Sequence, residues 1–446
     1  MIRIALPRLI DGVTRQGRNL LRRYAAGAFA RRTGGSGSHA MRLERLAHSL
    51  LSGRGEASGV LIATELLQIY AGATTDERLA FFRLLAERFD TGATALDAAW
   101  ARYKADGPSA LPALAQAVEA PRQELFRRLN LAPGGTAALV GMRADLLRAA
   151  RSAGGTLDAV DADLLHLLQS WFNRGFLTMR QIDWSSPANL LERVTRYEAV
   201  HHIRDWNDLR SRLDPPDRRC FAFFHPAMPD EPLIFVEVAL TRGMPDAIQS
   251  VLDPARAPMA SADADTAVFY SISNCQPGLK GVSFGHFLIK QVASDLKGDL
   301  PGLDCFVTLS PIPGFIAWLG KSDPALAEAC KSDDFDEEAR ASLTARAIEY
   351  FTTARTADNR PVDPVARFHL GNGARLERLN WMGDTSANGM RQSAGLMVNY
   401  LYDLANIETY HEAYANDGAV ILGDPFRATM RQLTKPTARA MARNRR

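Results

Sequence analysis

The sequence has only four cysteines in 446 residues, and they form no C-x-x-C pair and no regular spacing with histidine. The absence of these patterns argues against a zinc site and against a disulfide framework, so we expect reduced thiols and no metal. Long hydrophobic runs are missing too, since no apolar stretch approaches the roughly 20 residues that a membrane helix needs. We therefore predict a cytoplasmic protein that does not span a membrane.

Acidic residues are scarce at the two ends of the chain. Residues 1–32 hold eight arginines and one aspartate, and residues 431–446 hold five arginines, one lysine and no acid. The net charge of the whole chain is only +3, so the body between these ends is acidic. A nucleic-acid-binding domain would carry its basic face on the folded body, and we predict no nucleic-acid partner. The basic N-terminus is interpreted as a frayed helix of a bacterial protein; the alternative is a transit peptide for the mitochondrial matrix.

The 46% hydrophobic content suffices for several cores, and two regions differ in pattern. Helical periodicity dominates first, as in TTDERLAFFRLLAERFD, where we expect Thr75 to cap a helix with one apolar stripe. From about residue 190, strand-like runs such as EPLIFVEVALT, TAVFYSISN and CFVTLS alternate with helices, which predicts an α/β or α+β domain. The predicted organisation is a basic, flexible segment 1–39, a helical domain 40–185, a mixed α/β domain 186–432 and a basic tail 433–446.

A glycine-containing loop follows the strand-like run that ends near Ser273. The stretch SISNCQPGLKGVSFGHFLIKQV places Gly278, Gly281 and Gly285 between a strand and a helix, an arrangement that offers backbone N–H groups to a phosphate. No G-K-[ST] or G-x-G-x-x-G is present, and an ordinary strand-to-helix turn is the alternative. The order Gln276-x-Gly278-x-x-Gly281 resembles the pyrophosphate loop of GNAT-type acyltransferases, which bind coenzyme A where the next strand splays away.

That next strand leads into LDCFVTLSPIPGF, where we expect Pro311 and Pro313 to end the strand at Ser310. A serine hydroxyl needs an orienting or deprotonating partner for chemistry. Among the nine histidines, His369 is the candidate, because the glycines Gly371 and Gly373 that follow it permit close backbone approach. The alternative for both Ser310 and His369 is a structural role. No G-x-S-x-G elbow surrounds the serine, which disfavours an acyl-enzyme hydrolase.

Three blocks together resemble the malonyl-CoA decarboxylase family: SISNCQPGLKGVSFGHFLIKQV, TLSPIPGF, and FHLGNGARLERLNWMGDTSANGMRQSAGLMVNYLYDL. They cover the chain from about 180 to 430. The resemblance implies an α+β protein whose all-helical N-terminal domain forms a homodimer or homotetramer and whose catalytic domain is GNAT-like. It also implies the conversion of malonyl-CoA to acetyl-CoA and carbon dioxide without a cofactor.

The same resemblance assigns roles to individual positions. Ser310 would engage the malonyl carboxylate, His369 would protonate the enolate, for which its usual pKa of roughly 6.5 is suitable, and Tyr402 would orient one of them. Family members carry a glutamate where this chain has Ser283, so the role of that carboxylate does not transfer. The alternatives are a GNAT-type acyltransferase, a coenzyme A thioesterase and a non-catalytic scaffold. The residues expected to bind substrate or coenzyme A, besides Ser310 and His369, are Gln276, Gly278, Lys280, Gly281, Val282, Ser283, Phe284, Gly285 and His286.

Overall fold

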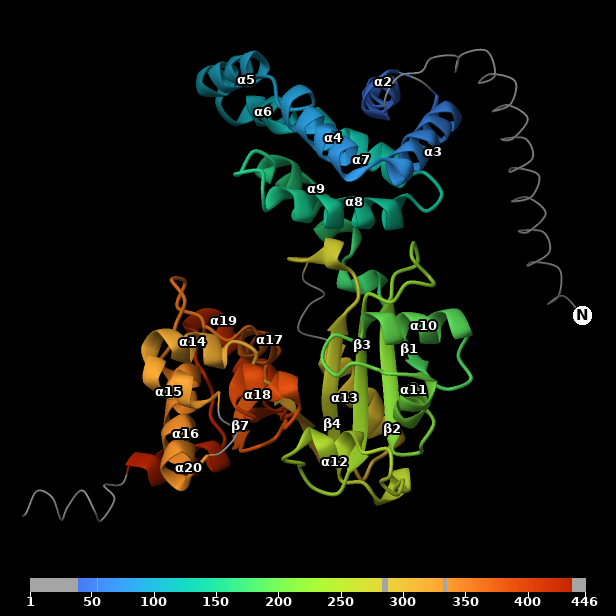
Figure 1. Ribbon diagram of the computed structural model, residues 1–446. Helices are drawn as coiled ribbons and strands as arrows, with labels where there is room; N and C mark the ends of the chain where they lie inside the picture. The colour runs from blue at the N-terminus through green and yellow to red at the C-terminus, as the bar shows by residue number, and fades with distance from the viewer. Residues whose placement is uncertain (1–38, 54, 283–287, 332–334, 435–446) are drawn as a thin grey trace, which may run out of the picture. The chain divides into compact units, whose positions relative to one another are not determined.

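The computed structural model describes residues 39–53, 55–282, 288–331 and 335–434. The chain divides into two compact units (Figure 1). One comprises residues up to Asn173 together with Gln276–Ser283, and the other comprises Arg174–Cys275 and the chain from Phe284 onward. Within the described ranges, no helix is both long enough and apolar enough to cross a membrane.

The first unit is helical, as the periodicity predicts. Its core consists of leucines, phenylalanines and alanines that recur on the inner faces of successive helices, such as Leu85, Leu125 and Leu146, each fully buried. Its helices are α2 (His39–Leu51), α3 (Glu56–Gly72), α4 (Thr75–Arg88), α5 (Ala93–Asp106), α6 (Leu111–Val118), α7 (Pro121–Asn130), α8 (Gly135–Ala150) and α9 (Asp158–Trp171).

The predicted cap of α4 is wrong by one residue. Thr74, rather than Thr75, is the N-cap: its hydroxyl accepts the Glu77 N–H, and the Glu77 carboxylate accepts the Thr74 N–H at 2.9 Å. This reciprocal pair is a capping box, which requires Ser or Thr three positions before Glu. The spacing T-x-x-E therefore selects Thr74 of the two adjacent threonines.

The second unit is built on an eight-stranded mixed sheet with the strand order β1-β2-β3-β4-β5-β8-β6, and β7 pairs with β8. The strands are β1 (Thr178–Ile182), β2 (Arg218–Phe224), β3 (Ile234–Thr241), β4 (Thr266–Asn274), β5 (Cys305–Thr308), β6 (Ser310–Pro311), β7 (Arg375–Asn380) and β8 (Met397–Leu401). Its helices are α10 (Ala188–Tyr197), α11 (Trp206–Leu213), α12 (Ile248–Leu252), α13 (Leu288–Asp299), α14 (Phe315–Ser322), α15 (Pro324–Ala329), α16 (Glu337–Thr352), α17 (Pro364–Gly371), α18 (Ala387–Ser393), α19 (Ile407–Asp417) and α20 (Asp424–Thr434).

Strands β4 and β5 run parallel and then part. They pair from Thr266↔Cys305 to Phe269↔Thr308, whereas the rest of β4 pairs with β3. The divergence begins beside an irregularity in the β3–β4 register between Glu237 and Val238. A helical N-terminal region followed by a mixed sheet confirms the predicted α+β fold, and the parting of β4 and β5 is the feature that the resemblance to GNAT-type proteins implies.

Two predicted boundaries differ from the structure. Strand β1 begins at Thr178 and pairs with β2, so the second unit starts before residue 185, the predicted end of the helical domain. The strand at LDCFVTLSPIPGF also does not end at Ser310: β5 ends at Thr308, and Ser310 and Pro311 pair with β8 as β6. Strand β6 lies at the edge of the sheet, where a proline without an N–H is tolerated.

Candidate functional site

Ser310 lies at the start of β6, opposite Val398 of β8, and is 5% exposed. Side chains alternate along this part of the chain, because Val307 and Leu309 join an apolar cluster while the hydroxyls of Thr308 and Ser310 contact each other at 2.9 Å. The serine thus occupies one face of the sheet, just beyond the point where β4 and β5 part. The expected position at the open end of a splayed strand pair is the position observed.

His369 lies near the end of α17, which Asp363 caps by accepting the Ala366 N–H at 2.7 Å. The chain must turn back at once to enter β7, and Gly373 permits this with φ 78°. A Cβ at Gly373 would lie 2.1 Å from the Ile407 carbonyl oxygen, so only glycine fits there. The glycine beside the candidate histidine therefore has the close-approach role that the sequence predicts.

Tyr350 contacts both the SPIPGF segment that contains Ser310 and the residue that caps the helix of His369. The Tyr350 hydroxyl donates to Asp363 Oδ2 at 3.2 Å, so it bonds to the residue that caps α17. The same hydroxyl lies 2.6 Å from the position that a Cβ would take at Gly314, in the SPIPGF segment. Burial raises the pKa of Asp363 to about 6. Tyr350 thus packs between the turn after Ser310 and the start of the helix that carries His369.

The structure brings the three predicted catalytic residues into one hydrogen-bonded chain. Ser310 Oγ lies 3.1 Å from His369 Nε2, and His369 Nδ1 lies 2.8 Å from the Tyr402 hydroxyl. Tyr402 directly follows β8, where its N–H donates to the Phe306 carbonyl. All three side chains are buried, being at most 5% exposed. Residues 310, 369 and 402 are distant in sequence and adjacent in space.

Burial determines the protonation states of His369 and Tyr402. It lowers the pKa of His369 to about 3, so the imidazole is neutral near pH 7. It also raises the pKa of Tyr402 well above its ordinary value, which keeps the phenol protonated. The expectation of an ordinary histidine pKa near 6.5 is therefore wrong, because the ring is removed from water and no charged partner in the described part of the chain offsets the loss of hydration.

Thr308 and Tyr400 belong to the site and were missed by sequence reasoning. Ser310 donates to Thr308 Oγ1 at 2.9 Å, and the Tyr400 backbone N–H donates to the same oxygen at 3.1 Å. The Tyr400 ring also stacks on His369, with 4.6 Å between ring centroids. A signal was available for both residues, because each lies two positions before a predicted site residue, and strand side chains at i and i+2 share a face.

The hydroxyl directions define the histidine tautomer. Because the Ser310 proton is directed to Thr308, the Ser310 oxygen is left to accept a proton from His369 Nε2. Nδ1 of the neutral ring then carries a lone pair and accepts from the Tyr402 hydroxyl. The chain of donors therefore runs from Tyr402 through His369 and Ser310 to Thr308.

The described part of the predicted coenzyme A segment groups with the helical unit. Arg143 of α8 donates to the carbonyl oxygens of Gly278 and Lys280, both at 2.7 Å. A Cβ at Gly278 would lie 1.8 Å from the Val140 carbonyl oxygen, so the glycine allows the segment to approach α8 closely. Gln169 of α9 donates to the Gly281 carbonyl at 3.3 Å. These contacts explain Gly278 by packing against a helix rather than by approach to a phosphate.

Several N–H groups of this segment are already used. Leu279, Lys280 and Val282 donate to carbonyls within the turn that begins at Gln276. The Lys280 side chain is exposed, and Val282 is buried. Ser283, Phe284, Gly285 and His286 lie outside the described residues. Coenzyme A binding by the segment stays a prediction.

Comparison with known proteins decides the family. A family model described as the malonyl-CoA decarboxylase C-terminal domain matches residues 175–440, and one described as the malonyl-CoA decarboxylase N-terminal domain matches residues 89–172. The chain belongs to the malonyl-CoA decarboxylase family. The resemblance carried by the three sequence blocks is thereby confirmed.

Relatives within the malonyl-CoA decarboxylase family include both mitochondrial and bacterial proteins. Mitochondrial malonyl-CoA decarboxylase of Anser anser anser is 36% identical over 331 residues, and that of Rattus norvegicus is 35% identical over 320 residues. These matches cover 65% and 63% of this chain and 65% of each relative, so the similarity spans slightly less than two thirds of the relatives' length.

Two solved bacterial structures are similar over most of the chain. Malonyl-CoA decarboxylase from Rhodopseudomonas palustris is 52% identical with a TM-score of 0.84, and that from Agrobacterium vitis is 53% identical with a TM-score of 0.81. Each comparison covers 87% of this chain and 99% of the other. The fold of this chain is thus similar to that of two solved members of the family.

Proposed function

We propose that this protein decarboxylates malonyl-CoA to acetyl-CoA and carbon dioxide. The observation that carries the proposal is the buried chain of Ser310, His369 and Tyr402, found in a member of the malonyl-CoA decarboxylase family. The relatives are named for this activity. The hydrogen-bonded residues Ser310, His369 and Tyr402 supply side chains that suit the steps of the reaction.

In the reaction, the bond between the malonyl carboxylate and the α-carbon breaks, and its electron pair moves into the thioester to form an enolate. The α-carbon then takes up one proton, which yields acetyl-CoA. The protein has to hold the carboxylate out of the thioester plane, stabilise the growing oxyanion and deliver the proton. The thioester itself accepts the electrons, so these tasks require only hydrogen-bonding and acidic side chains.

In this proposal Ser310 engages the malonyl carboxylate by turning its hydroxyl proton from Thr308 to a carboxylate oxygen, and His369 protonates the enolate carbon through Nε2. The neutral ring is suited to the second role, because Nε2 carries a proton and the Tyr402 hydroxyl stands behind Nδ1 to replace it. An enolate is a stronger base than imidazolate or phenolate, the conjugate bases that a neutral histidine or tyrosine leaves, so a neutral donor suffices. A buried, uncharged site also avoids placing a permanent cation beside the departing carbon dioxide.

The same proton direction disfavours the thioesterase alternative. A nucleophilic serine must give its proton to an unprotonated histidine nitrogen. Here Ser310 donates to Thr308 and faces a protonated Nε2, which is the reverse arrangement. The site is therefore arranged to supply a proton rather than to remove one from serine.

The test is incubation of the purified protein with malonyl-CoA alone, followed by chromatography of the coenzyme A products. We expect acetyl-CoA and carbon dioxide in equal amounts, with no acceptor added and no free thiol formed. Free coenzyme A without acetyl-CoA would instead indicate a thioesterase. Consumption of malonyl-CoA only after an amine is added would indicate an acyltransferase. Binding of malonyl-CoA without turnover would indicate a non-catalytic scaffold.

The segment Gln276–His286 is proposed to bind the coenzyme A part of the substrate, with exposed Lys280 supplying positive charge for its phosphates. The support is its resemblance to a pyrophosphate loop between a strand and helix α13. Assembly into a homodimer or homotetramer through the helical unit, and a cytoplasmic location, likewise remain predictions.

Thr308→Val is expected to lower kcat by about fivefold with little change in KM. The substitution keeps the shape of the side chain and removes the acceptor for the Ser310 proton, and one such hydrogen bond is typically worth about 1 kcal/mol. Thr308→Ser, which keeps the hydroxyl, should restore most of the activity. Steady-state kinetics of both variants measure this, and equal rates for Val and Ser would contradict the orienting role.

A further inference from the structure

The segment 276–282 belongs to the helical unit, although along the chain it follows strand β4 of the second unit. It is the described part of the stretch proposed above to bind coenzyme A. Two helices of the helical unit bind its backbone carbonyls, through Arg143 of α8 and Gln169 of α9. Side chains of the helical unit therefore set the conformation of this segment.

Arg143 is the main contact, and it is only 2% exposed. Its Nε donates to Asp161 Oδ1 at 2.8 Å, and its Nη1 donates to the carbonyl oxygens of Gly278 and Lys280, both at 2.7 Å. The guanidinium is planar and its donors have a fixed arrangement, so the ion pair with Asp161 also fixes the position of Nη1. One buried cation thus determines the direction of two peptide groups in the segment.

The direction of a carbonyl determines where the next N–H group points. In a trans peptide the C=O of one residue and the N–H of the following residue point in opposite directions. Because Arg143 binds the Lys280 carbonyl, the Gly281 N–H points away from Arg143. This N–H has no acceptor among the described residues, and Gly281 is exposed. The segment therefore presents a free backbone donor on the side opposite Arg143.

The two glycines of the segment make this arrangement possible. Gly281 has φ 83°, in the left-handed region that favours glycine. A Cβ at Gly278 would lie 1.8 Å from the Val140 carbonyl oxygen of α8, so only glycine lets the segment come close enough for Arg143 to bind it. The exposed Lys280 side chain lies between the two glycines in sequence. A free N–H next to a cationic side chain is a combination suited to a phosphate.

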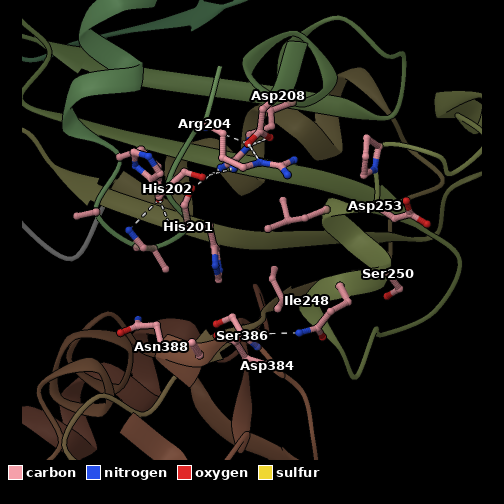
Figure 2. A pocket seen from close by; sticks show the side chains of 18 residues that line it. His201, His202, Arg204, Asp208, Ile248, Ser250, Asp253, Asp384, Ser386 and Asn388 are labelled. Atoms are coloured by element: carbon pink, nitrogen blue, oxygen red, sulfur yellow. Dashed lines mark hydrogen bonds and ion pairs between the residues drawn. The ribbon is translucent and has the colours of Figure 1, made fainter. Parts of the chain in front are cut away.

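A cavity in the second unit is the alternative place for an anionic group. Its volume is about 940 Å³, and it is lined by the segment between α10 and α11, by α12 and by the start of α18 (Figure 2). Among the described residues, four carboxylates and two arginines line it, so its charge is negative. Both arginines, Arg204 and Arg212, already donate to the Asp208 carboxylate. This cavity is therefore unsuited to the pyrophosphate of coenzyme A.

We propose that Arg143 is a positioning residue for coenzyme A, and that it holds the Gly278 and Lys280 carbonyls so that the Gly281 N–H can donate to the pyrophosphate. The inference rests on the proposed binding of coenzyme A by this segment. Gln169 supports the same conformation with one bond to the Gly281 carbonyl. The helical unit thereby takes part in substrate binding, in addition to its predicted role in assembly.

Arg143→Lys is expected to raise KM for malonyl-CoA by about tenfold with little change in kcat. The lysine keeps the charge beside Asp161 and is too short to hold both carbonyls, and one hydrogen bond to a charged group accounts for a factor of about ten. Steady-state kinetics of the full-length protein measure both constants. A merely structural loss would reduce the amount of active enzyme, which lowers the apparent kcat and leaves KM unchanged.

Malonyl-pantetheine is the control substrate, because it has the same reacting group and lacks every phosphate of coenzyme A. Its kcat/KM should be equal in Arg143→Lys and in the wild type, since no pyrophosphate is present to meet the Gly281 N–H. An equal loss with both substrates, or an unchanged KM for malonyl-CoA, would overturn the proposal.

Two further variants complete the test. Gln169→Ala removes an exposed side chain and one bond to the Gly281 carbonyl, so it should fold and raise KM for malonyl-CoA by about fivefold. If Arg143→Lys does not fold, an unchanged KM in Gln169→Ala contradicts the proposal by itself. Arg148→Lys is the matched control on the same helix: its side chain is 71% exposed and paired with Asp145, and its KM should equal that of the wild type.

Calorimetric titration with coenzyme A separates this inference from the proposed reaction, because it requires no turnover. Arg143→Lys should bind coenzyme A about tenfold more weakly than the wild type. A wild type that binds coenzyme A without decarboxylating malonyl-CoA would contradict the proposed reaction and leave the positioning role intact. Equal affinities of Arg143→Lys and the wild type would contradict the positioning role alone.

Discussion

His369→Asn is expected to lower kcat for malonyl-CoA decarboxylation by about a hundredfold or more, since proton donation by a positioned side chain typically contributes 10²- to 10⁴-fold. The asparagine amide occupies the place of Nδ1 and can keep the contact to Tyr402, whereas no atom replaces Nε2 beside Ser310. The variant should fold, because it fills most of the volume of the ring and keeps a polar partner for the phenol. Steady-state kinetics with acetyl-CoA detection, together with the thermal midpoint, check both expectations.

A turnover within a few-fold of the wild type would contradict the role of His369 as proton donor. The pH dependence gives an independent check. Because burial lowers the pKa of His369 to about 3, the histidine of the ligand-free protein does not titrate near pH 6.5. We therefore expect the kcat/KM profiles of the wild type and of His369→Asn to have the same shape near pH 6.5. An inflection near pH 6.5 that is present in the wild type and lost in His369→Asn would mean that the protonated ring is the active form.

Ser310→Ala is expected to lower kcat by a similar factor of about a hundred or more. The substitution removes the group proposed to engage the malonyl carboxylate and the acceptor for His369 Nε2–H, so two contacts are lost together. A single donor to a developing oxyanion is typically worth about 3 to 4 kcal/mol, which corresponds to this factor. The measurement is kcat with malonyl-CoA at saturation.

Ser322→Ala is the matched control for this variant. Ser322 lies at the end of α14 and donates to the Trp318 carbonyl at the surface, so its loss should leave kcat unchanged. Near wild-type turnover in Ser310→Ala would remove the serine from the mechanism and leave its hydroxyl with the structural role that a buried strand residue can have.

The two-region pattern and the sequence blocks were sufficient for the fold class. Helical periodicity identified the first unit, and the alternation in EPLIFVEVALT identified a strand observed as β3, because these patterns follow from burying one face of a regular element. Errors arose where neighbouring residues compete for one position, as Thr74 and Thr75 do for the cap of α4. They also arose at the edge of the sheet, where Pro311 takes part in a pairing that a central strand would not allow.

The sequence by itself determined which residues are candidates for the chemistry, since Ser310, His369 and Tyr402 are named by short motifs that can be read without a structure. Only the tertiary structure decided their state. The pKa of His369, the direction of the Ser310 proton and the role of Thr308 depend on how β5, β6, β8 and α17 enclose one another. Burial and hydrogen-bond direction arise from contacts between segments far apart in the chain, and local pattern carries no information about them.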